Sequence, residues 1–209
     1  TLLINMMESK NALIIFTRNP ELGKVKTRLA ATIGNQAALD IYKLLINHTV
    51  RITSTINADK YVFYSENIQQ NDAWNPSIFI KELQKGKDLG ERMKNAFDLL
   101  FKKGYQKIVI VGSDIYELNS QDIEDSFITL KTSSYVIGPA KDGGYYLLGM
   151  RQLNKNIFEN KNWGTDTVFK DTIEDLKENV VVLLSEKNDI DIYDDIKNME
   201  VFNQFLIKN

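Results

Sequence analysis

The stretch Lys107-Ile108-Val109-Ile110-Val111-Gly112-Ser113-Asp114 joins an uninterrupted apolar run to a glycine, a serine and an aspartate. A continuous rather than alternating apolar run, rich in β-branched residues, is typical of a strand buried on both faces, as in a parallel sheet covered by helices. Similar runs occur along the chain at 12–16, 61–64, 78–80, 135–137 and 180–184. The sequence therefore predicts a mostly parallel central sheet.

Segments with helical periodicity lie between these runs. Apolar residues keep to one face over 38–52, after a break at Gly34-Asn35, and again over 89–100. Strands and helices in alternation predict an α/β layered domain with right-handed crossovers. Open sheets of this kind bind their ligands at the carboxyl ends of the strands, where loops and helix starts converge.

Helix ends are the weaker part of this pattern. We expect Ser120 and Thr165 to cap two further helices, and the stretch 193–205 to form a final helix. His48 lies within a helical pattern, and with no second histidine and no cysteine in the chain it is a poor metal or triad candidate.

Length and composition exclude several classes of protein. The 209 residues carry 26 basic and 28 acidic side chains, a net charge of −2 that argues against nucleic-acid binding. The apolar fraction of 43% suffices for one sizeable core, so we expect a single domain over 1–209. No apolar run is long enough for a membrane helix, and the stretch 1–10 lacks the features of a signal peptide. The absence of cysteine suits a reducing cytoplasm.

The loop after the first strand is a candidate phosphate site. It runs from Thr17 to Leu29 and carries four basic side chains, Arg18, Lys24, Lys26 and Arg28. Gly23 permits a close backbone approach, the next helix offers free N–H groups, and Lys26 and Arg28 can bond phosphate oxygens. The spacing is not that of a Walker A loop, and a solvated basic loop explains the same residues equally well.

Two aspartates are candidates for a divalent metal. Asp114 ends a buried strand, where a carboxylate either holds Mg²⁺ together with substrate phosphates or caps the turn. Asp142 precedes Gly143 and Gly144, which either let the backbone approach a ligand or form a simple hairpin turn. The aromatic ring of Tyr145 either stacks on a sugar or base or belongs to the core.

Weaker signals lie elsewhere in the chain. Asp88 reads in isolation as a helix N-cap, with Arg92 in the turn that follows. Trp163 belongs to a loop that closes into a helix. The acidic stretch Asp189, Asp191, Asp194 and Asp195 is typical of a solvated surface, although one of these carboxylates could reach a metal.

Taken together and in order, these segments resemble a bacterial glycosyltransferase-A-like family of the nucleotide-diphospho-sugar transferase superfamily. Some of its members are described as arsenosugar-biosynthesis glycosyltransferases, and the family is related to molybdopterin and phospholactate guanylyltransferases. The matching pieces are Phe16, 23–29, 88–93, 112–114, 138–140, 142–147, and Trp163 with Thr165. This sequence departs from the pattern at Ile115-Tyr116, where relatives commonly have Cys-Pro, and at Gly164, where serine is frequent.

The resemblance implies a Rossmann-like three-layer α/β/α fold and a metal-dependent enzyme that transfers a sugar from a nucleotide-diphosphate sugar to a small acceptor. It implies Mg²⁺ or Mn²⁺ on Asp114 and Asp142, with Asp142 and Lys26 as catalytic groups. The residues expected to bind substrate or nucleotide are Phe16, Gly23, Lys26, Thr27, Arg28, Asp88, Gly90, Arg92, Ser113, Gly143, Gly144, Tyr145, Trp163 and Thr165.

Two other functions remain open from the sequence. One is a nucleotidyltransferase that joins an NTP to a phosphorylated small molecule and releases pyrophosphate. The other is a non-catalytic nucleotide-binding module, suggested by the altered loop after Asp114. The base, the sugar, the acceptor and the oligomeric state do not follow from the sequence.

Overall fold

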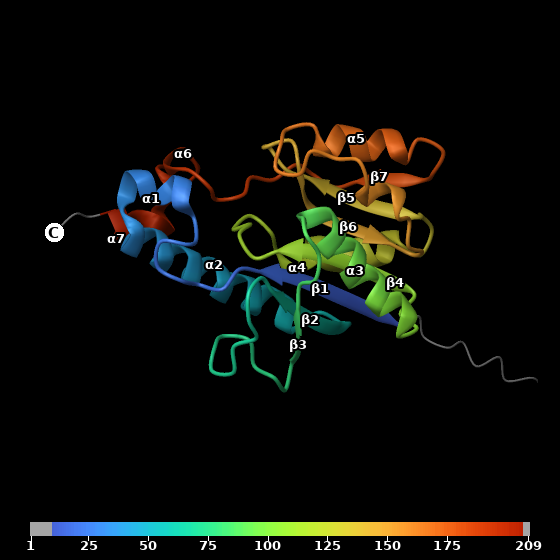
Figure 1. Ribbon diagram of the computed structural model, residues 1–209, viewed down its shortest axis with the longest axis horizontal. Helices are drawn as coiled ribbons and strands as arrows, with labels where there is room; N and C mark the ends of the chain where they lie inside the picture. The colour runs from blue at the N-terminus through green and yellow to red at the C-terminus, as the bar shows by residue number, and fades with distance from the viewer. Residues whose placement is uncertain (1–9, 207–209) are drawn as a thin grey trace, which may run out of the picture.

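A seven-stranded sheet with the strand order β3-β2-β1-β4-β6-β5-β7 forms the centre of the protein, as a computed structural model shows (Figure 1). The structure describes residues 10–206. The strands are β1 (Asn11–Thr17), β2 (Asp59–Tyr64), β3 (Phe79–Leu83), β4 (Lys107–Gly112), β5 (Tyr135–Pro139), β6 (Tyr145–Met150) and β7 (Val181–Leu183). Of these strands only β6 runs antiparallel to its neighbours. The expected mostly parallel sheet is confirmed.

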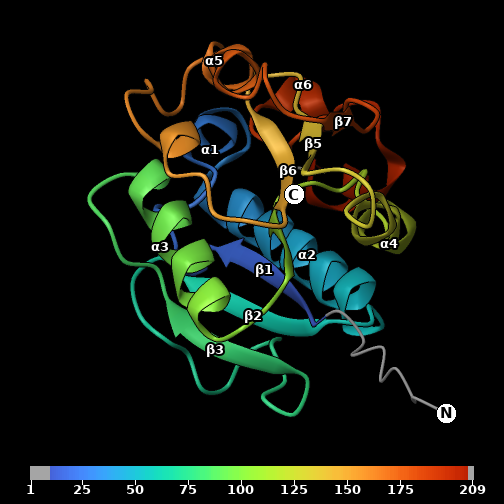
Figure 2. The ribbon, with the colours of Figure 1, turned by 90° about the vertical axis from the view of Figure 1, so that its right-hand side faces the viewer.

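Helices cover both faces of this sheet, which gives the expected three-layer α/β/α architecture (Figure 2). Among residues 10–206, no helix is both long and apolar enough to cross a membrane. The helices are α1 (Thr27–Ile33), α2 (Asn35–Ser54), α3 (Leu89–Lys102), α4 (Ser120–Thr129), η1 (Asn156–Phe158), α5 (Val168–Asp175), α6 (Tyr193–Ile196), η2 (Glu200–Phe202) and α7 (Asn203–Leu206).

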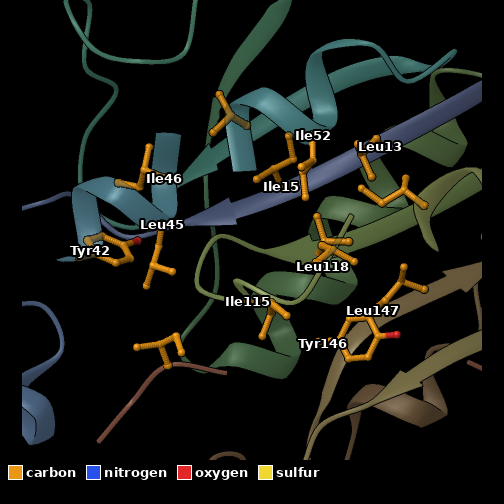
Figure 3. Packing of buried hydrophobic residues seen from close by; sticks show 14 of the residues in the cluster. Leu13, Ile15, Tyr42, Leu45, Ile46, Ile52, Ile115, Leu118, Tyr146 and Leu147 are labelled. Atoms are coloured by element: carbon orange, nitrogen blue, oxygen red, sulfur yellow. The ribbon is translucent and has the colours of Figure 1, made fainter. Parts of the chain in front are cut away.

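The continuous apolar runs are explained by burial on both faces. In β1, Leu13 and Ile15 pack into one core cluster with α2 and α4, as Figure 3 shows from close by. Ile14, between them, points to the other cluster, which α3 and α5 cover. All three side chains have no exposed surface. A strand with polar residues on alternate positions could not fill both clusters, so the run of β-branched residues specifies a central strand.

Several predicted helix ends are wrong. We expected Ser120 to cap a helix, but the N-cap of α4 is Asn119. The side chain of Asn119 accepts a hydrogen bond from the N–H of Asp122 at 3.1 Å. We also expected Thr165 to cap a helix, but α5 begins only at Val168. The Thr165 hydroxyl donates to the carbonyl of Asn162 and does not cap α5.

The prediction of one final helix over 193–205 is also wrong, because the chain forms the three short helices α6, η2 and α7 there. Met199 has an extended backbone (φ −103°, ψ 108°), which interrupts the helical hydrogen bonds between α6 and η2. This break lets the end of the chain fold back so that α6 lies beside α1 and α7 beside α2 (Figure 1).

The order of the strands places a switch point between β1 and β4. The chain leaves β1 toward β2 on one side, and β4 is added on the other side, so their connections diverge at the carboxyl ends. The segment after β7 crosses this same end of the sheet, where the N–H of Ile190 donates to the carbonyl of Asp114 at 3.1 Å. Loops from the beginning, middle and end of the chain therefore meet there.

The turn between β5 and β6 depends on Gly143. Its φ is +88°, and a Cβ built there would lie 2.2 Å from the carbonyl oxygen of Asp166. The carbonyl of Gly143 also accepts from the N–H of Phe169 at 2.9 Å. The hairpin interpretation of the glycine pair is thus correct, and the space beside Gly143 holds the backbone that leads into α5.

Replacing Gly143 by alanine should therefore destabilise the protein more than replacing Gly164. Both glycines have a left-handed backbone, with φ +88° at Gly143 and +86° at Gly164, but nothing lies within 4 Å of a Cβ at Gly164. We expect about 1 kcal/mol for Gly164→Ala, from the backbone conformation alone, and at least about 3 kcal/mol for Gly143→Ala. Urea unfolding of both variants measures the difference; equal losses would contradict the role given to the Asp166 contact.

Candidate active site

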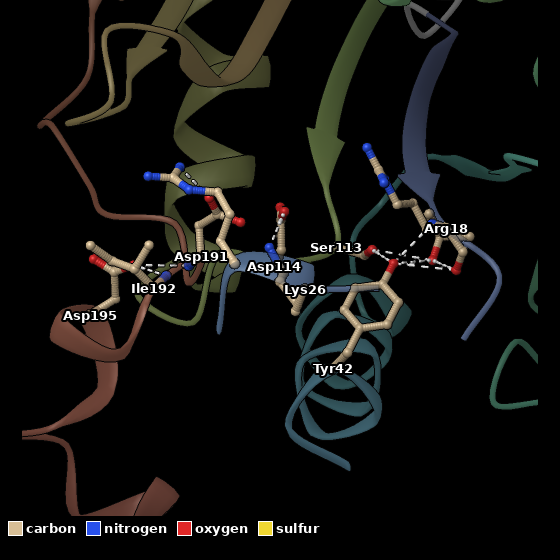
Figure 4. Close-up of polar contacts among 10 residues, drawn as sticks. Arg18, Lys26, Tyr42, Ser113, Asp114, Asp191, Ile192 and Asp195 are labelled. Atoms are coloured by element: carbon tan, nitrogen blue, oxygen red, sulfur yellow. Dashed lines mark hydrogen bonds and ion pairs between the residues drawn. The ribbon is translucent and has the colours of Figure 1, made fainter. Parts of the chain in front are cut away.

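An ion pair between Lys26 and Asp114 lies at the switch point of the sheet. Lys26 directly precedes α1, and Asp114 follows the end of β4 by two residues. The Nζ of Lys26 lies 2.9 Å from Oδ2 of Asp114, with the lysine side chain only 8% exposed and the aspartate side chain 36% exposed (Figure 4). The fold thus brings together the two charged residues that the sequence singled out in separate loops.

The local backbone aims Lys26 into the protein. Val25 is buried and anchors the loop in the core on the α2 side of the sheet. Lys26 itself has a left-handed backbone (φ +48°), and its carbonyl accepts the first helical hydrogen bond, from the N–H of Ala30 at 2.8 Å. A left-handed conformation costs a non-glycine residue about 1 kcal/mol, and strain of this kind is common at functional sites.

Negative charge exceeds positive charge around this ion pair. Burial alone lowers the pKa of Lys26, but Asp114, Asp191 and Asp189 together raise it above its ordinary value. Burial, followed by the charges of Asp114 and Asp142, raises the pKa of Asp189 to about 6, against the opposing effect of Lys26. Three carboxylates therefore act on one site, although no group of three or more acidic or histidine side chains within 10–206 is close enough to hold a metal.

Arg28 forms a second ion pair with the segment that crosses the site. Its Nη1 lies 2.6 Å from Oδ2 of Asp191, and the arginine side chain is 71% exposed. Asp195 fixes this segment, since its carboxylate accepts from the N–H groups of Asp191 and Ile192 at 2.9 and 2.7 Å. The interpretation of the stretch 189–195 as a merely solvated surface is thus wrong for Asp189 and Asp191.

Ser113 lies in a buried polar network beside the ion pair. Its hydroxyl lies 3.0 Å from the hydroxyl of Tyr42 and donates to Oγ1 of Thr17 at 3.1 Å. The Tyr42 hydroxyl accepts from the N–H of Arg18 at 2.8 Å. These bonds join α2 to the ends of β1 and β4 (Figure 4). Sequence reasoning missed Tyr42; a tyrosine on the apolar face of a helix, with one polar atom that needs a partner, is the signal that could have found it.

The loop after Asp114 is anchored by the two residues that depart from the family pattern. Ile115 is 4% exposed and belongs to the core. The ring of Tyr116 packs against His48 and Phe202, with centroid distances of 4.8 and 5.4 Å. These contacts attach the loop that follows Asp114 to the core, to α2 and to η2.

Several other predicted residues form a separate group on the α3 side of the sheet. The indole of Trp163 covers Gly90 so closely that a Cβ there would lie 2.2 Å from its Nε1. Phe16 and Tyr145 pack on the same cluster as Trp163. The hydroxyl of Tyr145 is buried and has no hydrogen-bond partner within the described chain, and burial raises its pKa.

The remaining candidates make local contacts. Asp88 is the N-cap of α3, as expected, and accepts from the N–H of Glu91 at 2.8 Å. Arg92 donates from Nε to the carbonyl of Gly86 at 3.1 Å. The Oδ1 of Asp142 accepts from the N–H of Gly144 at 2.8 Å, which closes the β5–β6 turn.

Thr27 and Gly23 belong to the loop that carries Lys26. Thr27 is the first residue of α1 and is exposed, and Gly23 has a left-handed φ of +74° in the exposed turn before it. A Cβ at Gly23 would meet only the side chain of Asn35, at 3.8 Å. Backbone conformation therefore requires this glycine, and the space outside it stays accessible to a ligand.

The raised pKa of Asp189 predicts a pH-dependent stability. Because its pKa of about 6 in the folded protein exceeds that of about 3.9 in an unfolded chain, ionisation costs folding free energy in full above pH 6, and this cost shrinks as the pH falls from about 6 to about 3.9. After allowance for solvent screening, Asp189→Asn should stabilise the protein by about 1–2 kcal/mol at pH 7.5 and by about half as much at pH 5. Urea unfolding at both pH values measures this difference, with the exposed Asp194→Asn as the control. An equal effect of Asp189→Asn at the two pH values would contradict it.

Three solved structures share this fold. A protein from Desulfovibrio desulfuricans G20, described provisionally as a nucleotide-diphospho-sugar transferase, is 28% identical and matches with a TM-score of 0.84 over 96% of this chain and 100% of its own. The inositol-1-phosphate CTP transferase of T. maritima is 13% identical, with a TM-score of 0.52 over 94% and 95% of the two chains. The 4-diphosphocytidyl-2C-methyl-D-erythritol synthase of Anaerococcus prevotii DSM 20548 is 9% identical, with a TM-score of 0.58 over 94% and 96%.

The last two comparisons show the fold alone, a Rossmann-like α/β/α fold shared by transferases of nucleotides and nucleotide sugars. No curated protein matches the chain in sequence. Residues 49–165 match the bacterial family DUF2064, described as "Uncharacterized protein conserved in bacteria". Since this match spans more than half of the chain, the protein belongs to the DUF2064 family.

Proposed function

We propose that the protein is a metal-dependent transferase that passes a sugar from a nucleotide-diphosphate sugar to a small acceptor. The observation that carries this proposal is the Lys26–Asp114 ion pair at the switch point of the sheet, where open α/β sheets bind nucleotides. The likeness to the Desulfovibrio protein, at 28% identity over nearly the whole chain, supports the same class of substrate.

Lys26 and Arg28 are the cations that would hold the diphosphate. Lys26 is nearly buried, so its ammonium group is poorly solvated and interacts strongly with a phosphate oxygen. Both side chains are paired with carboxylates, Asp114 and Asp191, in the absence of substrate. A diphosphate bound to these two cations would leave the carboxylates of Asp114 and Asp191 without partners, so that they could bind another cation.

The residues present fit a divalent metal. Asp114 and Asp142 offer the oxygen ligands that Mg²⁺ and Mn²⁺ prefer, and Mg²⁺ commonly needs only one or two carboxylates besides substrate phosphates. Burial, and then the charges of Asp114 and Asp142, raise the pKa of Asp189 against the opposing effect of Lys26, which supports a site where a further positive charge would be favourable. When bound, the metal would supply Lewis-acid stabilisation of the charge that develops on the departing diphosphate.

Asp142 is also the candidate that would take the proton of the acceptor hydroxyl. Its Oδ1 is held by the N–H of Gly144, and no hydrogen bond to Oδ2 is present within residues 10–206. A carboxylate fixed by one oxygen and accessible at the other is suited to accept a proton from a bound hydroxyl group.

The aromatic group on the α3 side would form one wall of the substrate site. Phe16 and Tyr145 end or begin strands at the same edge of the sheet as Asp114, and Trp163 packs with them. Flat apolar side chains of this kind suit the faces of a base or sugar ring. Asp88, Gly90 and the other residues expected to contact nucleotide stay predictions.

Nucleotidyl transfer is the second candidate function. The folds of the T. maritima and Anaerococcus proteins, both of which carry cytidylyl chemistry in their descriptions, favour it. Lys26 and Arg28 would then hold the phosphates of an NTP, and pyrophosphate would leave. The residues are shared by both reactions, so the products distinguish them.

Metal-dependent binding should require Asp114. We expect Asp114→Ala to abolish the Mg²⁺- or Mn²⁺-dependent part of nucleotide-sugar binding, because it removes the carboxylate paired with Lys26, which we propose as a metal ligand. Isothermal titration calorimetry with and without metal measures it. Asp40→Ala, on the exposed side of α2, is the control, and an unchanged metal dependence in Asp114→Ala would refute the metal role.

Phosphate binding should require the basic loop. Lys26→Ala with Arg28→Ala should weaken nucleoside diphosphate binding about 100-fold or more at low salt, because each charge-assisted bond contributes roughly 1.5–3 kcal/mol. The loss should shrink as salt rises. The control is Lys24→Ala, an exposed cation of the same loop that pairs with Glu21; an equal loss there would mean that only the general charge of the loop matters.

The experiment that decides between the functions has two steps. A thermal-shift screen of nucleotides and nucleotide sugars, with and without divalent metal, identifies the ligand, because binding to the folded state raises the melting temperature. Turnover of that ligand with a panel of acceptors then identifies the reaction. Release of a nucleoside diphosphate supports sugar transfer, release of pyrophosphate supports nucleotidyl transfer, and tight binding without turnover over the panel supports a binding module.

A further inference from the structure

A basic pocket lies at the end of the sheet opposite to the candidate active site. It has a volume of about 620 Å³ and is lined by Tyr105, Gln106, Lys107, Lys131 and Arg151. Lys107 begins β4 and Asp114 follows its other end, so the two sites are roughly 20 Å apart at about 3.3 Å for each residue of the strand. The volume falls within the usual range of small-molecule pockets.

The antiparallel strand β6 brings two of the cations side by side. Ile108 of β4 pairs with Met150 of β6, so the next position outward places Lys107 opposite Arg151. Like charges directly opposite each other in adjacent strands destabilise a sheet. Lys131, which follows α4, lies at the same pocket and adds a third positive charge.

None of these three cations forms an ion pair within residues 10–206. Lys131 and Arg151 are exposed, which is typical of cations on a solvated surface. Lys107, in contrast, is only 9% exposed. Burial lowers the pKa of Lys107, and the charges of Lys131 and Arg151 lower it further, with no acidic group of residues 10–206 opposing them. A nearly buried lysine without an anion beside it is costly, which distinguishes this pocket from an ordinary basic surface.

We propose that this pocket is a second binding site, for the diphosphate group of a small molecule. Three cations around one cavity match a group with several negative charges and many acceptor oxygens, whereas a single carboxylate would leave two of the cations without a partner. Arg151 can bond two phosphate oxygens at once, and the lysines supply point charges. Free pyrophosphate and a nucleoside diphosphate share this chemistry.

The site can be tested by calorimetric titration of the full chain with inorganic pyrophosphate. The variant with Lys26→Ala and Arg28→Ala is used as the background, so that neither cation of the candidate active site contributes to binding. We expect Lys131→Gln with Arg151→Gln to weaken pyrophosphate binding about 100-fold, roughly tenfold for each lost charge. Lys155→Gln, which removes an exposed lysine elsewhere, is the control and should change nothing.

A second readout separates binding from damage to the fold. Because the substitutions relieve repulsion between like charges, the double variant without ligand should melt about 1–3 °C higher than its parent. Pyrophosphate should raise the melting temperature of the parent and no longer raise that of the double variant. The proposal therefore expects the double variant to have a higher melting temperature and to bind pyrophosphate more weakly than its parent.

Nucleoside diphosphates in the same titration distinguish the two sources of the group. Tighter binding than pyrophosphate supports a nucleotide site, and equal binding supports a site for free diphosphate. Three results would overturn the proposal: no binding of pyrophosphate to the background variant that lacks Lys26 and Arg28, an unchanged affinity after Lys131→Gln with Arg151→Gln, or tighter binding of a single-stranded oligonucleotide than of pyrophosphate. The first two also leave the proposed transferase function intact, since neither involves Asp114.

Discussion

The contact between the ammonium group of Lys26 and the carboxylate of Asp114 is the interaction on which the candidate site depends. It joins the loop after β1 to the loop after β4 in a place where water has little access to the lysine. Burying a lysine to this degree is costly, and an anion beside it offsets part of that cost. Under the proposed function, a phosphate would replace the carboxylate beside Lys26, and a metal ion would replace the ammonium group beside Asp114.

The fold and the centre of this site could be predicted from the sequence for one reason. The runs that became β1 and β4 have no polar residue in their interior, and only a sheet covered on both faces can bury them. Once two such strands are parallel, their carboxyl ends lie at the same edge, so Lys26 and Asp114 had to be near each other. The proximity of residues distant in sequence followed from the direction of the strands.

Features that depend on long-range packing could not be predicted in this way. Asp189 and Asp191 reach the site because the segment after β7 crosses the end of the sheet, where the N–H of Ile190 donates to the carbonyl of Asp114. The acidic composition of that segment suggested a solvated surface instead. The burial of Ser113 depends on Tyr42, a residue whose helical spacing indicates only core. Helix starts were displaced by a residue or more at Asn119 and Val168, because side-chain hydrogen bonds of neighbouring residues compete for the same backbone groups.

The fold-back of the last part of the chain also has a consequence for synthesis on the ribosome. The sheet strands β1 to β4 can pair while the rest of the chain is still being made, but Arg28 and Lys26 then face a site that lacks Asp189 and Asp191. The additional negative charge arrives only when residues 189–191 emerge and dock beside Asp114. A nascent chain would therefore attract anions more strongly, and divalent cations less strongly, than the finished protein.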